Sequence, residues 1–101
     1  MATTMKSKQV KVEFSGISRM LTGQNEYQLQ LAEDATIGDV IAAVAESYPA
    51  LVGEVIDADR RHLIETNVFS INGQRIIQRN ETEVSPQDGD TIILLSLLAG
   101  G

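Results

Sequence analysis

The sequence predicts an α+β domain in which one main helix lies across a β-sheet. Apolar and polar residues alternate along residues 10–14 and again along 27–31, which is the period of a half-buried strand. Residues 37–48 carry an apolar stripe with helical spacing, and residues 91–95 form an apolar run typical of a buried strand. The chain has 101 residues, 43% hydrophobic and only 4% aromatic, which is enough for one domain with an aliphatic core.

The first part of the chain predicts a loose tail followed by a β-hairpin. Residues 1–8 are polar and lack periodicity, so we expect a flexible tail there and a single domain over residues 9–101. The strand at 10–14 is expected to pair with the strand at 27–31. Residues 16–23 begin and end with glycine and interrupt the alternation, which predicts the loop of the hairpin.

The main helix is predicted to begin after Thr36 and to end before Pro49. The Thr36 side chain can cap the helix, and Asp39, three residues later, completes a weaker form of the capping box. Proline disfavours helical geometry in the residue before it, which ends the helix at Tyr48. Residues 50–64 predict a short helix or an irregular crossover. The residues expected to form the core between helix and sheet are Val40, Ile41, Val44, Val12, Phe14, Ile71, Ile92 and Leu94.

The second half of the chain predicts three more strands. Residues 68–71 and 74–77 flank Asn72-Gly73, a strong signal for a tight hairpin turn. The last strand, 91–95, follows a polar, turn-rich segment, and its continuous apolar run predicts a place at the centre of the sheet. This order of elements is that of the β-grasp, or ubiquitin-like, fold.

Alternation along the last strand predicts a surface for a partner protein. Ile92 and Leu94 should face the helix, which places Ile93 and Leu95 on the opposite side of the sheet. Because this fold has no second layer there, we expect two exposed aliphatic residues that form a docking patch. The alternative is that the segment 50–67 covers them.

Composition excludes several function classes. The chain has no cysteine, which excludes disulfides, iron–sulfur clusters, thiolate zinc sites and a cysteine nucleophile. A net charge of −6 disfavours nucleic acid and anionic membranes as partners. No apolar run is long enough to cross a bilayer and no signal sequence is visible, so we expect a cytoplasmic protein. The single histidine, His62, predicts neither a metal site nor a catalytic triad, so an autonomous enzyme is not expected.

The sequence ends with Gly100-Gly101 after an apolar segment. Glycine has no Cβ, so such an end can lie extended in a channel that is too narrow for other residues. The terminal carboxylate would then be the group that a partner enzyme reaches. The alternative is a disordered terminus without function.

The chain resembles the sulfur-carrier proteins related to the small subunit of molybdopterin synthase (MoaD) and to the thiamine sulfur carrier (ThiS). The resemblance covers residues 9–101, and no single motif decides it. Where the molybdopterin-synthase type often has a Pro-Pro pair before its tail, this chain has Ser96 and Leu97. The matching segments are residues 10–14, 19–23, 35–40, 48–51, 71–73, 88–90 and the end Leu98-Ala99-Gly100-Gly101.

The resemblance implies a reaction at the end of the chain. The Gly101 carboxylate would be adenylated by a ubiquitin-activating-type enzyme that consumes ATP, and a sulfur donor would convert it to a thiocarboxylate. Gly100 would give reach, and Leu97, Leu98 and Ala99 would position the tail. No cofactor would be bound permanently. The acceptor would be the large subunit of molybdopterin synthase, in the biosynthesis of the molybdenum cofactor.

Other functions stay open at this point. A ubiquitin-like modifier would pass the same activated carbonyl group to lysine side chains of substrate proteins. A sulfur carrier for another pathway, such as tRNA thiolation or thiamine synthesis, is a further alternative. A third hypothesis is a β-grasp binding module whose diglycine does not react.

Overall fold

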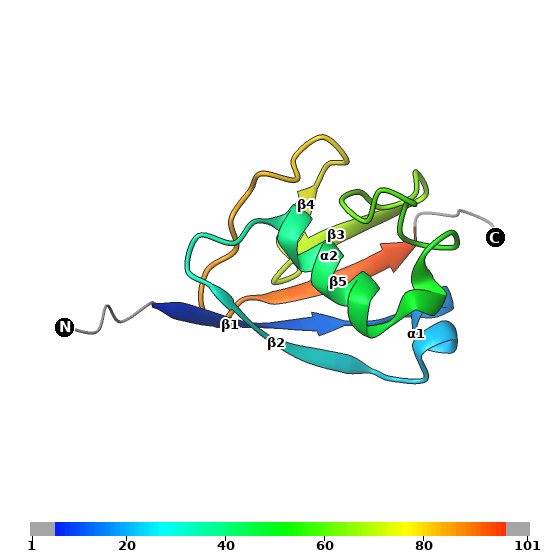
Figure 1. Ribbon diagram of the computed structural model, residues 1–101, viewed down its shortest axis with the longest axis horizontal. Coiled ribbons are helices and arrows are strands. Elements are labelled where there is room, and N and C mark those ends of the chain that lie inside the picture. The colour runs from blue at the N-terminus through cyan, green and yellow to red at the C-terminus, as the bar shows by residue number, and fades with distance from the viewer. Residues whose placement is uncertain (1–5, 97–101) are drawn as a thin grey trace.

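The computed structural model describes residues 6–96, in which a five-stranded sheet carries one main helix across a face (Figure 1). The strands lie in the order β2-β1-β5-β3-β4. Within these residues, no helix is long and apolar enough to cross a membrane. The elements in chain order are β1 Ser7–Glu13, α1 Gly16–Thr22, β2 Glu26–Ala32, α2 Ile37–Ser47, the 3₁₀ turn η1 Pro49–Leu51, β3 Asn67–Ile71, β4 Arg75–Ile77 and β5 Thr91–Ser96.

The last strand lies at the centre of the sheet, as its apolar run predicts. β5 pairs in parallel with β1 and antiparallel with β3. The hairpin β1–β2 is antiparallel, with Val12 opposite Tyr27, and β3–β4 is a second antiparallel hairpin. Because a parallel pair needs a crossover, the chain between β1 and β5 passes over the sheet and carries α2 with it. This topology confirms the α+β, β-grasp prediction.

Helix α2 begins and ends where the sequence predicts. The Thr36 N–H donates a 2.8 Å hydrogen bond to the Asp39 carboxylate, and the Asp39 N–H donates to Thr36 Oγ1 at 3.4 Å. The chain then turns into η1 at Pro49, which is typical of a proline just past a helix end. The apolar stripe is buried at Ile37, Val40, Ile41 and Val44, and Tyr48 is half-buried.

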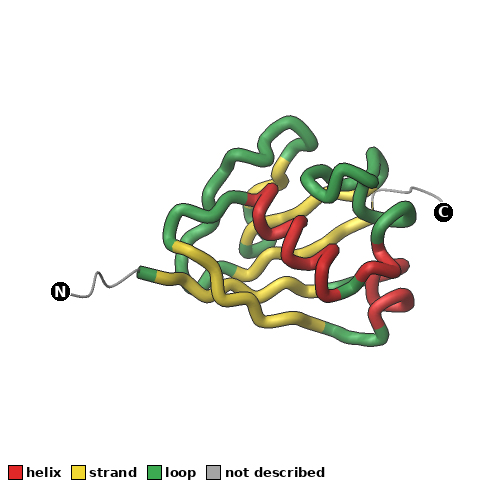
Figure 2. The backbone as a smooth tube through the Cα atoms, in the orientation of Figure 1, coloured by secondary structure: helices red, strands yellow, loops and turns green. Residues whose placement is uncertain are grey.

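Figure 2 shows α2 lying across one face of the sheet. The buried cluster contains residues of both α2 and the strands. The turn η1 and the crossover after it add Leu51, Val55, Ile56 and Leu63 to this same cluster. Each Val, Leu or Ile side chain that is fully buried contributes about 1.5–3 kcal/mol of favourable transfer free energy. The predicted core residues are all members of the cluster except Ile71, which is partly buried and packs against it.

Helix α1, Gly16–Thr22, occupies the segment 16–23, for which the prediction of a simple hairpin loop is wrong. Ser15 has an extended backbone before the helix, and Gly23 adopts a left-handed conformation with φ of 68° after it. The Gly23 N–H donates to the Arg19 carbonyl oxygen at 2.9 Å, which closes the last turn. The two glycines thus lie at the ends of a two-turn helix, where they do not interrupt it.

The first strand begins at Ser7, so Ser7 and Lys8 belong to the sheet rather than to a loose tail. The Lys8 side chain faces α2 and is only 3% exposed. Its ammonium group donates to Ala35 O at 2.8 Å, Ser85 Oγ at 2.9 Å and Pro86 O at 2.6 Å. All three donors of the lysine therefore have acceptors, which makes burial of the cation tolerable.

Candidate functional site

The predicted reactive tail lies outside the residues that the structure describes. This applies to Leu97, Leu98, Ala99, Gly100 and Gly101. The structure does show where the tail begins, because Ser96 is the last residue of β5. The candidate site is therefore the end of β5 together with the surfaces that flank it.

Strand β3 and the Ser15 side chain hold the end of β5 in place. On one side, pairing with β3 continues to the end of the strand, where Ser96 lies opposite Asn67. On the other side, pairing with β1 stops at Ile93. Beyond that point the Ser15 hydroxyl donates a 2.7 Å hydrogen bond to the Leu94 carbonyl oxygen. Since Ser15 directly precedes α1, this bond connects α1 to the strand from which the tail leaves.

The sheet face opposite α2 has an apolar half next to this strand end. Val68 pairs with Leu95, while Ser70 pairs with Ile93 on one side and Ile76 on the other. Residues that are paired directly across strands lie on the same face of a sheet. We call Val68, Ile76, Ile93 and Leu95 the apolar half-face.

The structure places Ile93 and Leu95 on this face, and Ile92 and Leu94 on the α2 side at 0% and 2% exposed. The expectation that Ile93 and Leu95 are well exposed is wrong, because both are half-buried. They lie in a central strand, so side chains of the strands on both sides shield them. Ile76, on the edge strand β4, is 43% exposed. The Asn72-Gly73 turn fixes the register of β4, and this signal could have placed Ile76 on the apolar half-face.

The other half of this face is charged. Lys11 of β1 lies 3.5 Å from the Glu13 carboxylate and 3.8 Å from that of Glu26 on β2. Such partly exposed pairs contribute about 0–1 kcal/mol each. This face is therefore charged over β1 and β2, and apolar over β5, β3 and β4.

Helix α1 presents a second apolar surface that the sequence reasoning missed. Met20 is 82% exposed, Ile17 42% and Leu21 36%. Ser18, in contrast, is 1% exposed, and its hydroxyl donates to the Ser15 carbonyl oxygen at 2.8 Å. The helix lies at the same end of the molecule as the end of β5 (Figure 1). The spacing of the three apolar residues could have revealed a helix there, but the flanking glycines indicated a loop.

Some ionisable side chains away from this end form pairs. Arg61 Nη1 lies 2.9 Å from Asp39 Oδ1, and Arg79 Nη2 lies 2.9 Å from Asp57 Oδ2. The pKa of Asp39 is lowered, first by the hydrogen bond from the Thr36 backbone N–H and then by Arg61. No group of three or more His, Cys, Asp or Glu side chains that could hold a metal is present among residues 6–96.

His62 is part of a small hydrogen-bonded loop. Its Nδ1 lies 2.6 Å from Asp59 Oδ2. Hydrogen bonds from the Arg61 backbone N–H and from His62 lower the pKa of Asp59. These hydrogen bonds hold His62 against the Asp59 carboxylate within the loop before Leu63.

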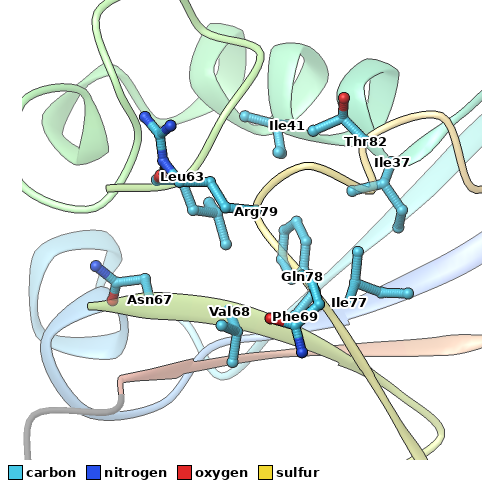
Figure 3. Close-up of a pocket in the computed structure, with 10 residues that line it drawn as sticks. All are labelled: Ile37, Ile41, Leu63, Asn67, Val68, Phe69, Ile77, Gln78, Arg79 and Thr82. Carbon is cyan, nitrogen blue, oxygen red and sulfur yellow. Dashed lines mark hydrogen bonds between the residues drawn. The ribbon is translucent and has the colours of Figure 1, made fainter. Parts of the chain in front are cut away.

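A small hollow lies between α2 and strands β3 and β4 (Figure 3). Its volume of about 10 Å³ is enough for roughly one water molecule. Arg79 closes one side, where its Nε donates to the Leu63 carbonyl oxygen at 3.2 Å. The hollow is a packing defect under the crossover and is too small for a substrate. The residues that line it are Ile37, Ile41, Leu63, Asn67, Val68, Phe69, Ile77, Gln78, Arg79 and Thr82.

Comparison with known proteins identifies the family. The sequence profile of the ThiS family matches residues 12–101. The chain belongs to the ThiS family. This ThiS-family protein is 27% identical over 93 residues to small archaeal modifier protein 3 of Haloferax volcanii, which covers 92% of the chain and 99% of that protein. It is 28% identical over 93 residues to the molybdopterin synthase sulfur carrier subunit of Chlamydomonas reinhardtii, with the same coverage, 92% and 99%.

Solved structures support the same fold for this ThiS-family protein. The crystal structure of SAMP1 from Haloferax volcanii superimposes with a TM-score of 0.77 at 22% identity. The match covers 92% of this chain and 99% of that one. Family members are small ubiquitin-like sulfur carriers or modifiers, not catalysts themselves.

Proposed function

We propose that the chain is a sulfur carrier whose Gly101 carboxylate is activated and converted to a thiocarboxylate, most simply as the small subunit of a molybdopterin synthase. Membership of the ThiS family carries this proposal, and the similarity to a molybdopterin synthase sulfur carrier subunit supports its finer form. The chemistry needs a partner because a carboxylate has no good leaving group. In a ubiquitin-activating-type enzyme, the carboxylate oxygen attacks the α-phosphate of ATP, and pyrophosphate leaves. A sulfur nucleophile then displaces AMP.

The described residues support this role through what they offer a partner. The end of β5 is held by β3 and by Ser15, so the tail starts from a fixed point. The apolar half-face lies beside that point, and its partly exposed side chains, Ile76, Ile93 and Leu95, are suited to burial against another protein. We propose Ile93 and Leu95 as part of the contact with the activating enzyme or with the synthase large subunit.

A second candidate function is a protein modifier. The similarity to small archaeal modifier protein 3, at 27% identity over nearly the full length of both chains, favours it specifically. Activation would be the same, but the acyl group would pass to a lysine amine and form an isopeptide bond. The two functions therefore diverge only after Gly101 has been adenylated.

The test is activation in vitro followed by intact-mass measurement. The full chain is incubated with the activating enzyme of the same organism, ATP and a sulfur donor. We expect a mass gain equal to the difference between sulfur and oxygen. Deletion of Gly101 should abolish the gain and the release of pyrophosphate, and should barely change the melting temperature because termini make few packed contacts. Adenylation of the truncated chain would contradict the proposal.

Protein isolated from cells separates the two candidates. A thiocarboxylate on free protein supports sulfur delivery. Substrate peptides that carry a Gly-Gly remnant on lysine, absent when Gly101 is deleted, support the modifier. If cells that need the molybdenum cofactor contain neither the thiocarboxylate nor lysine conjugates of this protein, both functions are contradicted.

A further inference from the structure

Helix α1 has its apolar stripe on the outside. Ile17, Met20 and Leu21 have the i, i+3, i+4 spacing of one helix face, which in most surface helices points to the core. Here that face is exposed, up to 82% at Met20, whereas Ser18 is buried at 1%. We call Ile17, Met20 and Leu21 the α1 ridge. Three neighbouring exposed aliphatic side chains on so short a helix are more than the isolated apolar residues expected on a surface.

The charge around the ridge also differs from that of the whole chain. The net charge is −6, yet no acidic residue lies between Glu13 and Glu26. Arg19, in the middle of this segment, is exposed and forms no ion pair with any residue from 6 to 96. A partner that meets this surface would thus need apolar side chains and a carboxylate for Arg19.

The position of the ridge identifies the partner. Five residues follow Ser96, and a fully extended chain spans at most about 3.3–3.6 Å per residue, so Gly101 can lie no more than about 16–18 Å from the end of β5. An enzyme that holds Gly101 in its active site must therefore come close to that end of the sheet. Helix α1 packs against β5 there, and the Ser15 hydroxyl bonds to the Leu94 carbonyl oxygen at 2.7 Å.

We propose that the α1 ridge is a docking contact for the enzyme that activates Gly101, and that Arg19 pairs with a carboxylate of that enzyme. This inference rests on the proposed function, since it needs an activating enzyme. It adds a second contact surface, outside the sheet, to the one proposed on the apolar half-face. The ridge and the apolar half-face flank the start of the tail, so the enzyme would contact the carrier on both sides of the strand that delivers the carboxylate.

The experiment is ATP–pyrophosphate exchange catalysed by the activating enzyme of the same organism, with the concentration of the carrier varied. Met20→Glu should raise the KM for the carrier about tenfold or more with little change in kcat, because a new charge at the centre of an apolar contact is poorly tolerated. Met20→Ala should raise it less. Arg19→Glu should also raise the KM, and its effect should weaken at high salt.

The control is Gln87→Glu, which makes the same charge change as Met20→Glu at an exposed position before the start of β5, whereas the tail follows its other end. Its KM should equal that of the wild type, and all variants should melt at the wild-type temperature. An unchanged KM for both Met20 variants would overturn the inference. A wild-type dimer that Met20→Glu converts to a monomer without any KM change would also overturn it, since the ridge would then bind a second copy. If the wild type itself supports no Gly101-dependent exchange, the proposed function fails instead.

Discussion

The two faces of strand β5 carry the same kinds of residue but have different surroundings. Ile92 and Leu94 face α2 and are 0% and 2% exposed, whereas Ile93 and Leu95 face away and are half-buried. Side-chain chemistry alone therefore does not decide which aliphatic residues form the core. The difference comes from α2 and the crossover, which cover only one face. Most of the stability should reside on the covered face, and the other face can change partners without unfolding the domain.

Lysines of strand β1 repeat this contrast. Lys8 faces α2, and its ammonium group has three neutral acceptors within 2.9 Å. Lys11 lies on the opposite face in two partly exposed ion pairs. The same residue type is thus a buried structural element on one face and a surface charge on the other.

The largest expected effect comes from placing a carboxylate on each face in turn. Val44→Asp would bury an unpaired charge in the core and should cost about 4 kcal/mol or more, so that much of the protein unfolds. Leu95→Glu on the apolar half-face should cost about 1 kcal/mol or less. Urea unfolding followed by circular dichroism measures both free energies. Similar costs for the two variants would refute the division into a covered and an open face.

Leu95→Glu also tests docking. Binding to the activating enzyme or to a synthase large subunit should weaken about tenfold, since a desolvated contact tolerates a new charge poorly. Isothermal titration with wild type and variant side by side gives the comparison. If the variant folds and binds like the wild type, the apolar half-face has no role in partner contact.

An intermediate effect is expected from the two lysines. Lys8→Met removes three hydrogen bonds and leaves buried acceptors without their donor, which should cost about 1–3 kcal/mol. Lys11→Met is the matched control and should cost about 0–1 kcal/mol. Equal free energies of unfolding for the two variants would show that the ammonium group of Lys8 contributes nothing beyond its apolar stem.

The smallest effect concerns the start of the helix that covers the core. The pKa of Asp39 is lowered by the Thr36 N–H and by Arg61, so its folded pKa lies below the ordinary value of 3.8. The stabilisation is therefore full above that value and disappears as the pH falls through the folded pKa. Asp39→Ala should cost about 1 kcal/mol at neutral pH, and the difference from wild type should shrink in acid.

Unfolding free energies across an acid pH series check this prediction. Asp34→Ala is the control, because Asp34 is exposed and its side chain has no hydrogen bond to the described residues. A constant difference between wild type and Asp39→Ala at every pH would contradict the capping role.

The sequence predicts the strands and α2 well because their signals are local. Alternation, the Thr36 cap, Pro49 and the Asn72-Gly73 turn each depend on neighbouring residues. The candidate site is harder to predict from the sequence, since the exposure of a side chain depends on residues far away along the chain. Ile93 and Leu95 are shielded by adjacent strands, which alternation does not describe.

The sequence pattern did not predict two features, the buried Lys8 and the exposed apolar stripe of α1. In each, the usual relation between polarity and burial is reversed. Lys8 lies at an inward position, and its acceptors come from residues far along the chain, Ala35, Ser85 and Pro86. Helix α1 carries its apolar stripe toward solvent, and its flanking glycines indicated a loop instead of a helix. The burial of Lys8 and the exposure of the α1 stripe both depend on contacts between residues that are far apart in the sequence.

The central position of β5 also affects how the protein is made. Both helices, α1 and α2, and the other four strands of the described chain are synthesised before Thr91–Ser96. Until then, β1 and β3 have no common neighbour, and their inner edges carry unpaired backbone groups of the kind that promote aggregation. The two hairpins can form early, but the sheet closes only when the strand that bears the tail arrives. A nascent chain therefore exposes these edges until β5 has been made, and in the folded domain the strand that leads to the tail is already in place.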